Sequence, residues 1–114
     1  MVVLLINPFT VRDGAEARFL ELWDETSRLF EASPGFVSAR LGRAAAAQAP
    51  GQSAPFTHVN VAEWASADHY ADALRNDALR KFGPLYREVS AFDPALYEIV
   101  RDVGALSDRS GRKS

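Results

Sequence analysis

Hydrophobic residues along this 114-residue chain change their spacing in a fixed order, and that order limits the folds open to it. Residues 2–9 are apolar with little alternation, which is typical of a strand covered on both faces. Apolar residues then recur at helical spacing opposite a charged face, so an amphipathic helix is predicted next. Phe19, Leu20, Trp23 and Phe30 form its apolar stripe, and Ser27 stands at the same helical spacing.

The ends of this helix also have sequence signals. Asp13 stands three residues before Glu16, which is the spacing of a capping box at a helix start. Pro34 and Gly35 predict the end of the helix, because proline cannot continue it and glycine suits the turn that follows.

Two further strands are predicted beyond that turn. Residues 36–43 alternate between apolar and polar, and residues 56–64 form a second strand-like run. The link between them, "AAAAQAPGQSAP", is either a long hairpin loop or a short helical turn capped by a loop.

The remaining chain predicts a second helix and a last strand. Ser66 can cap the helix, with Tyr70, Ala73 and Leu74 as its apolar stripe. A short irregular or helical segment is expected over residues 81–94, which contain two prolines and a glycine. A strand over residues 95–100 then closes the domain, which we place at 1–103, with 104–114 as a polar, flexible C-terminal tail.

The element order is strand, helix, strand, strand, helix, strand. This predicts an α+β, ferredoxin-like βαββαβ fold in which two helices cover one face of a four-stranded antiparallel sheet. The first strand is apolar at both parities, and Val59 and Val61 point away from the face that carries Asn60, so both faces of the sheet look buried. The helices of one chain can cover only one face, and we therefore predict a homodimer whose sheets pack together as a dimeric α/β barrel.

Composition removes several classes of partner. Thirteen basic and fifteen acidic residues leave a formal charge of -2, which does not favour nucleic acid. No stretch approaches the ~18 apolar residues that a membrane span needs, and the chain has no cysteine, so the cytoplasm is the default expectation. The chain has only two histidines, and they lack the spacing of metal ligands, so we do not expect a metal site. It also lacks a glycine-rich phosphate-binding loop, so we do not expect a nucleotide cofactor.

The strand at 56–64 carries the candidate site. Asn60 and Trp64 are four positions apart, so both project from one face at a separation of ~13 Å. Tyr70 from the following helix and Asn7 from the first strand can reach the same space. A buried amide without a partner costs ~1 to 3 kcal/mol. The Asn60 amide can find this partner in a ligand or in neighbouring backbone. In the second case, Trp64 only caps the core, and its indole N–H is paired within the protein.

Two histidines and one more tryptophan also stand near this region. His58 has the parity of Asn60 and is a possible general base near neutral pH. His69 follows Ser66 and Asp68, but neighbours at such spacing on a helix do not face one another, so helix capping explains them better than a catalytic triad. Trp23 is expected in the core or in a pocket wall.

"VNVAEWASADHY", with Asn60, Trp64 and Tyr70, resembles the second half of the antibiotic biosynthesis monooxygenase (ABM) family of dimeric α/β barrels. Residues 2–102 fit the element order of that family, and "PGFVSARL" at 34–41 resembles its entry into the second strand.

The resemblance implies an activity. Quinone-forming members oxidise anthrone-like aromatic polyketides with O₂ and without flavin, haem or metal. Residues matching Asn60, Trp64 and Tyr70 bind and activate the substrate there, so these three are our expected catalytic residues. An arginine after the second helix also takes part, and Arg80 and Arg87 are both candidates. The expected substrate-binding residues are Asn7, Trp23, His58 and Arg87.

Two other functions fit the same fold. Haem-degrading members of the family use a first-strand Asn, which Asn7 matches, but the position of their helix Trp holds Ala73 here, and no histidine follows residue 75 to serve as the axial ligand. A non-enzymatic dimer that binds a small aromatic ligand would share every fold feature.

Overall fold

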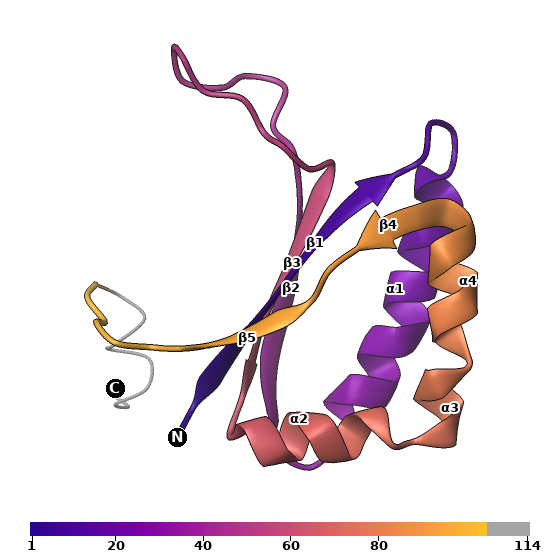
Figure 1. Ribbon diagram of the computed structural model, residues 1–114, viewed down its shortest axis with the longest axis vertical. Coiled ribbons are helices and arrows are strands. Elements are labelled where there is room, and N and C mark those ends of the chain that lie inside the picture. Colours follow the sequence, from indigo (N-terminus) through magenta and orange to yellow (C-terminus); the bar gives the residue numbers. More distant parts are fainter. Residues whose placement is uncertain (105–114) are drawn as a thin grey trace.

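The structure is a computed structural model that describes residues 1–104 (Figure 1). The tail expected over 104–114 lies, from residue 105 on, outside the described residues. The elements are β1 (Val3–Val11), α1 (Glu16–Glu31), β2 (Phe36–Arg43), β3 (His58–Trp64), α2 (Ala67–Leu74), α3 (Asp77–Arg80), α4 (Phe82–Val89), β4 (Ser90–Phe92) and β5 (Ala95–Glu98).

The sheet confirms the predicted ferredoxin-like α+β fold, with one correction. Its strand order is β2-β3-β1-β4, and β5 also pairs with β1, so the sheet has five strands instead of the predicted four. β4 pairs with the C-terminal part of β1 and β5 with its N-terminal part, so both occupy the same edge. Pro94 lies between them and has no N–H to donate to a ladder, which explains why β4 and β5 are separate strands. The additional strand β4 lies within residues 81–94, where only an irregular or helical segment was expected, and β5 lies within the strand expected over residues 95–100.

Helix α1 starts without the predicted capping box. Its N-cap is Ala15, and no side chain caps it, so the expected pairing of Asp13 with Glu16 is wrong. The buried residues are Phe19, Leu22 and Thr26, so the buried stripe is rotated slightly from the predicted one. Gly35 follows the helix at φ +86°, where a Cβ would also collide with the His69 side chain.

The second helical region agrees with its capping signal. The backbone N–H of His69 donates to Ser66 Oγ at 3.2 Å, which confirms Ser66 as the cap of this helix. The His69 ring Nδ1 lies 2.8 Å from the same oxygen, so the expectation that these two side chains do not face one another is wrong. The irregular or helical segment expected over 81–94 contains a regular helix, α4. Pro84 is tolerated there because it stands in the first turn, where a backbone N–H has no partner within the helix.

All helices lie on one side of the sheet (Figure 1). The side chains opposite them form an open face with exposed apolar residues, including Val61 at 39% and Tyr97 at 55% exposure. The link between β2 and β3 contains no helix and projects from the body as an extended loop, so the hairpin alternative is confirmed (Figure 1). Across residues 1–104, no helix combines the length and apolarity of a membrane span.

Candidate active site

A cavity of about 250 Å³ lies between the helix-covered face of the sheet and the helices. Its walls are largely aromatic and aliphatic. Asn60, Trp64 and Tyr70 all line it, as the spacing of the sequence predicted, and Asn7 and Trp23 line it as well. The sequence therefore located the cavity by the side chains that point into it.

The two asparagines face each other across the central strand pair. Asn7 on β1 stands opposite Asn60 on β3 in the antiparallel register. Directly opposed residues share a sheet face with Cβ atoms ~5 Å apart. Two amides therefore lie side by side on the floor of the cavity.

Asn60 has a side-chain partner that the sequence did not suggest. The indole Nε1 of Trp23 donates to Asn60 Oδ1 at 3.1 Å. This bond crosses from α1 to β3 and fixes the orientation of the amide, because the oxygen is the end that accepts. The amide nitrogen of Asn60 is left to donate.

Trp64 is almost completely enclosed, at 1% exposure. The rings of Phe30, Phe36 and Tyr70 meet it edge to face at centroid distances of 5.6, 5.4 and 5.6 Å. Within residues 1–104, neither Trp64 Nε1 nor Asn7 Oδ1 has a hydrogen-bond partner. The alternative in which the Trp64 indole N–H is paired inside the core is therefore not what the structure shows.

Thr26 and Tyr86 also line the cavity, and sequence reasoning missed both. Their hydroxyl oxygens lie 2.7 Å apart. The signal for Thr26 was its spacing after Phe19 and Leu22, which places a polar residue within the buried stripe. Tyr86 was obscured by the glycine and proline before it.

The two cavity tyrosines keep their protons at neutral pH. Burial raises the pKa of Tyr86 to about 12. Burial also raises the pKa of Tyr70. Both rings therefore offer the cavity neutral hydroxyl groups.

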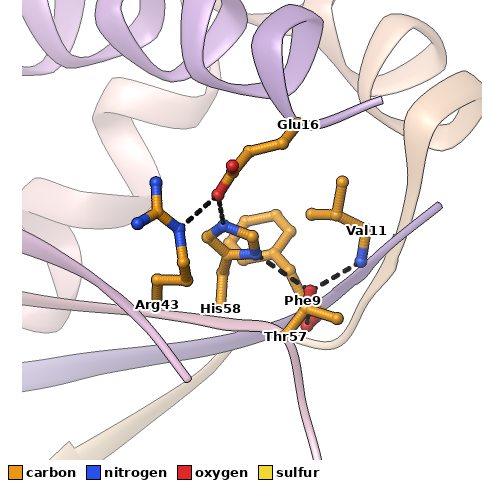
Figure 2. A network of polar contacts seen from close by, with 6 residues as sticks. All are labelled: Phe9, Val11, Glu16, Arg43, Thr57 and His58. Atoms are coloured by element: carbon orange, nitrogen blue, oxygen red, sulfur yellow. Dashed lines mark hydrogen bonds and ion pairs between the residues drawn. The ribbon is translucent and has the colours of Figure 1, made fainter. Parts of the chain in front are cut away.

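His58 does not line the cavity, although it has the parity of Asn60. Its ring is buried against α1, where Nε2 donates to Glu16 Oε2 at 2.8 Å and Nδ1 lies 2.9 Å from Thr57 Oγ1 (Figure 2). Arg43 Nε donates to the same carboxylate oxygen at 2.6 Å. The structure thus places His58 in a polar network at one end of β3.

Comparison with known proteins assigns the family. Residues 2–84 match the family model described as antibiotic biosynthesis monooxygenase. The chain belongs to the ABM family. Among curated protein sequences, none matches it.

Solved structures of similar chains agree with the fold. SnoaB, a cofactor-independent oxygenase from Streptomyces nogalater, is 25% identical, with a TM-score of 0.72 over 90% of this chain and 96% of that chain. An Arg-to-Ser variant of MhuD, with two manganese protoporphyrin IX molecules bound per active site, is 24% identical, with a TM-score of 0.66 over 90% and 99% of the two chains. The second likeness is one of fold alone.

The two candidate arginines of this ABM chain both lie outside the cavity lining. Arg80 is exposed, and its guanidinium lies 3.9 Å from Asp77. Arg87 is also exposed, but its guanidinium stands 5.8 Å from the ring centroid of Phe92, which itself lines the cavity. Arg87 is therefore the one in contact with a cavity wall.

The polar groups of the cavity are donors and acceptors without charge. Its lining contains no carboxylate and no histidine among the residues that the structure describes. In the same part of the chain, no group of three or more potential metal ligands comes together. The site can bind and polarise an aromatic molecule through neutral hydrogen bonds.

Proposed function

We propose that this ABM chain is a cofactor-independent monooxygenase that oxidises a small aromatic substrate of the anthrone or hydroquinone type with O₂. The observation that carries the proposal is the buried indole N–H of Trp64, which lies without a protein partner in the wall of an aromatic cavity. Such a group costs ~1 to 3 kcal/mol when unpaired. A substrate oxygen would supply its partner. The likeness to SnoaB supports the same class of reaction.

The reaction needs no redox group from the protein. An anthrone loses a proton from its CH₂ group to solvent, and the resulting anion is electron-rich enough to pass an electron to O₂, whose reduction takes up that proton again. Recombination of the two radicals forms a C–O bond, and cleavage of the O–O bond then leaves a carbonyl and releases water. The balance is CH₂ + O₂ → C=O + H₂O, so the substrate supplies all the electrons.

The protein's part is to stabilise the anion. The Asn60 amide nitrogen and Trp64 Nε1 are fixed donors for the substrate oxygens that carry the developing negative charge, and the enclosed site strengthens such bonds. Tyr70 adds a neutral hydroxyl, because its raised pKa keeps the proton in place. Asn7 Oδ1 can accept a hydrogen bond from a substrate hydroxyl.

His58 is not the base in this proposal, because its ring contacts Glu16 and Thr57 instead of the cavity. The substrate itself must be acidic enough to lose its proton, which anthrones and hydroquinones are. Arg87 contributes through the Phe92 wall and by its positive charge near the cavity.

Oxygen uptake with anthrone and hydroquinone tests the proposal. In Asn60→Ala and Trp64→Phe, kcat is expected to fall ~10²- to 10³-fold, because each change removes one donor to the developing charge. Arg80→Gln is the matched control outside the cavity and should keep full activity. Unchanged turnover in both cavity variants would contradict the roles of Asn60 and Trp64. Oxygen uptake no faster than in the absence of protein would favour a non-enzymatic aromatic-binding protein, and a Soret shift on adding haemin would favour the haem alternative.

We also infer that the chain works as a homodimer. The sheet face opposite the helices carries Leu4, Ile6, Val59, Val61 and Tyr97, and no other element of residues 1–104 covers it. A contiguous exposed apolar face of this kind marks a protein contact. Sedimentation should show a dimer at micromolar concentration, and a stable monomer would contradict the inference.

A further inference from the structure

Tyr86 lines the cavity, and its hydroxyl proton is engaged in a hydrogen bond within the protein. Tyr86 Oη lies 2.7 Å from Thr26 Oγ1, and the same threonine oxygen lies 3.0 Å from the carbonyl oxygen of Leu22 and 3.2 Å from that of Trp23. Carbonyl oxygens only accept, and a threonine hydroxyl has one proton. That proton serves the carbonyls of α1, as is common for threonine within a helix, so Tyr86 is the donor to Thr26.

What Tyr86 offers to a ligand follows from this direction. Its single proton points to Thr26, so the phenol oxygen presents only lone pairs. The tyrosine stays neutral, since burial raises its pKa to about 12. Thr26, at 6% exposure, is fixed in the buried stripe of α1.

The surroundings of this oxygen are aromatic. The rings of Phe9 and Phe92 lie 5.9 and 6.1 Å from the Tyr86 ring, and both line the cavity. Asn7, two residues from Phe9 on β1, brings a second acceptor that has no partner within residues 1–104. Acceptors thus stand among aromatic walls, while the donors of Asn60 and Trp64 come from β3.

We propose that Tyr86, oriented by Thr26, is a specificity-determining acceptor that selects polycyclic aromatic substrates with a free hydroxyl group over their methyl ethers. A hydroxyl donates to the Tyr86 oxygen, whereas a methyl ether brings only another acceptor to it. Sites that hydrogen-bond a substrate hydroxyl discriminate strongly against analogues that lack it. The substrate class rests on the proposed function, whereas the direction of the hydrogen bond rests on the geometry alone.

Ligand binding tests this without turnover. The probes are 2-hydroxyanthraquinone, 2-methoxyanthraquinone and unsubstituted anthraquinone, and quenching of the two tryptophans, which both line the cavity, reports their Kd. Wild type should bind the hydroxy compound about fivefold to tenfold more tightly than the methoxy compound, which corresponds to one net hydrogen bond. Tyr86→Phe should remove this preference.

Thr26 variants give the sharper result. Thr26→Val removes the group that holds the Tyr86 proton, so the phenol becomes able to donate and the preference should shift toward the methoxy compound. Thr26→Ser keeps the hydroxyl and should keep the wild-type preference. Circular dichroism confirms folding of each variant.

The outcomes separate this inference from the proposed function. Equal affinity of wild type for the hydroxy and methoxy compounds would overturn the role of Tyr86 while leaving the cavity and its oxygen uptake intact. A uniform loss of affinity for all three probes in Tyr86→Phe, with no shift in Thr26→Val, would show a packing role and also overturn it. If the wild-type protein binds none of the three probes, both the role of Tyr86 and the proposed function are contradicted.

Discussion

Two groups of polar side chains in this molecule differ in whether their hydrogen bonds are made within the protein. At the end of β3, Thr57 Oγ1 accepts from Val11 N at 2.8 Å and donates to the Phe9 carbonyl at 3.1 Å, and His58 joins it to Glu16 (Figure 2). In the cavity, Asn7 Oδ1 and Trp64 Nε1 have no partner within residues 1–104. The first cluster makes its hydrogen bonds within the protein, and we propose that the second makes them with a ligand.

This difference separates stability from binding. A buried network in which every polar group has a hydrogen-bond partner stabilises the fold. The loss of one member leaves its partners without hydrogen bonds. Unsatisfied groups lower stability, and they gain their bonds only when something enters the cavity. We therefore expect substitutions in the two clusters to move stability in opposite directions.

The largest expected change is in the complete network. Thr57→Val keeps the shape of the side chain but removes the partner of the Val11 N–H and of the His58 ring, so the free energy of unfolding should fall by ~2 to 3 kcal/mol. Urea denaturation measures it. Oxygen uptake per folded molecule should stay at the wild-type level, and a loss of activity at full folding would break the separation of the two clusters.

A smaller change of opposite sign is expected in the cavity. Asn7→Leu replaces a buried unpaired acceptor by an apolar side chain of similar size, so the free energy of unfolding should rise by ~1 kcal/mol. Affinity for hydroxylated aromatics should fall in the same variant. A destabilised Asn7→Leu protein would mean that the amide is satisfied in solution, and Asn7→Ala distinguishes this from a packing effect.

The smallest effect is a pH dependence. The Arg43 guanidinium and the His58 ring hold the pKa of the Glu16 carboxyl below its usual value of 4.5. This contribution to stability is present above the unfolded-state pKa and is lost as pH falls through the folded-state pKa. Urea midpoints of wild type and Glu16→Gln should therefore differ most at neutral pH and converge in acid. A constant difference from pH 7 to pH 3 would contradict the coupling.

Much of the fold could be predicted because the pattern of apolar and polar residues along each strand matches the face that each side chain occupies in the sheet. β2 was predicted at its observed bounds, and the alternation around Asn60 placed that residue and Trp64 on the helix-covered face. The additional strand β4 could not be predicted in the same way, because its pairing depends on which of its backbone groups face β1.

The site was only partly visible in the sequence for a related reason. Strand periodicity determines which face a side chain occupies but not what it contacts, so His58, with the parity of Asn60, was expected in the cavity and lies in the network instead. Tyr86 reaches the cavity from a helix that starts at Phe82 with a proline in its first turn. Its pairing with Thr26 is a contact between α1 and α4 that no local pattern records.

We expect a ligand in the cavity to complete the hydrogen bonds that the protein leaves open. The chain has two tryptophans, so its ¹H–¹⁵N spectrum has two indole signals, which Trp23→Phe assigns. On titration with 2-hydroxyanthraquinone, the Trp64 Nε1–H signal should move downfield and exchange more slowly with solvent, while the Trp23 proton keeps its bond to Asn60. Saturating ligand that leaves the Trp64 proton unshifted and its exchange unchanged would contradict the account.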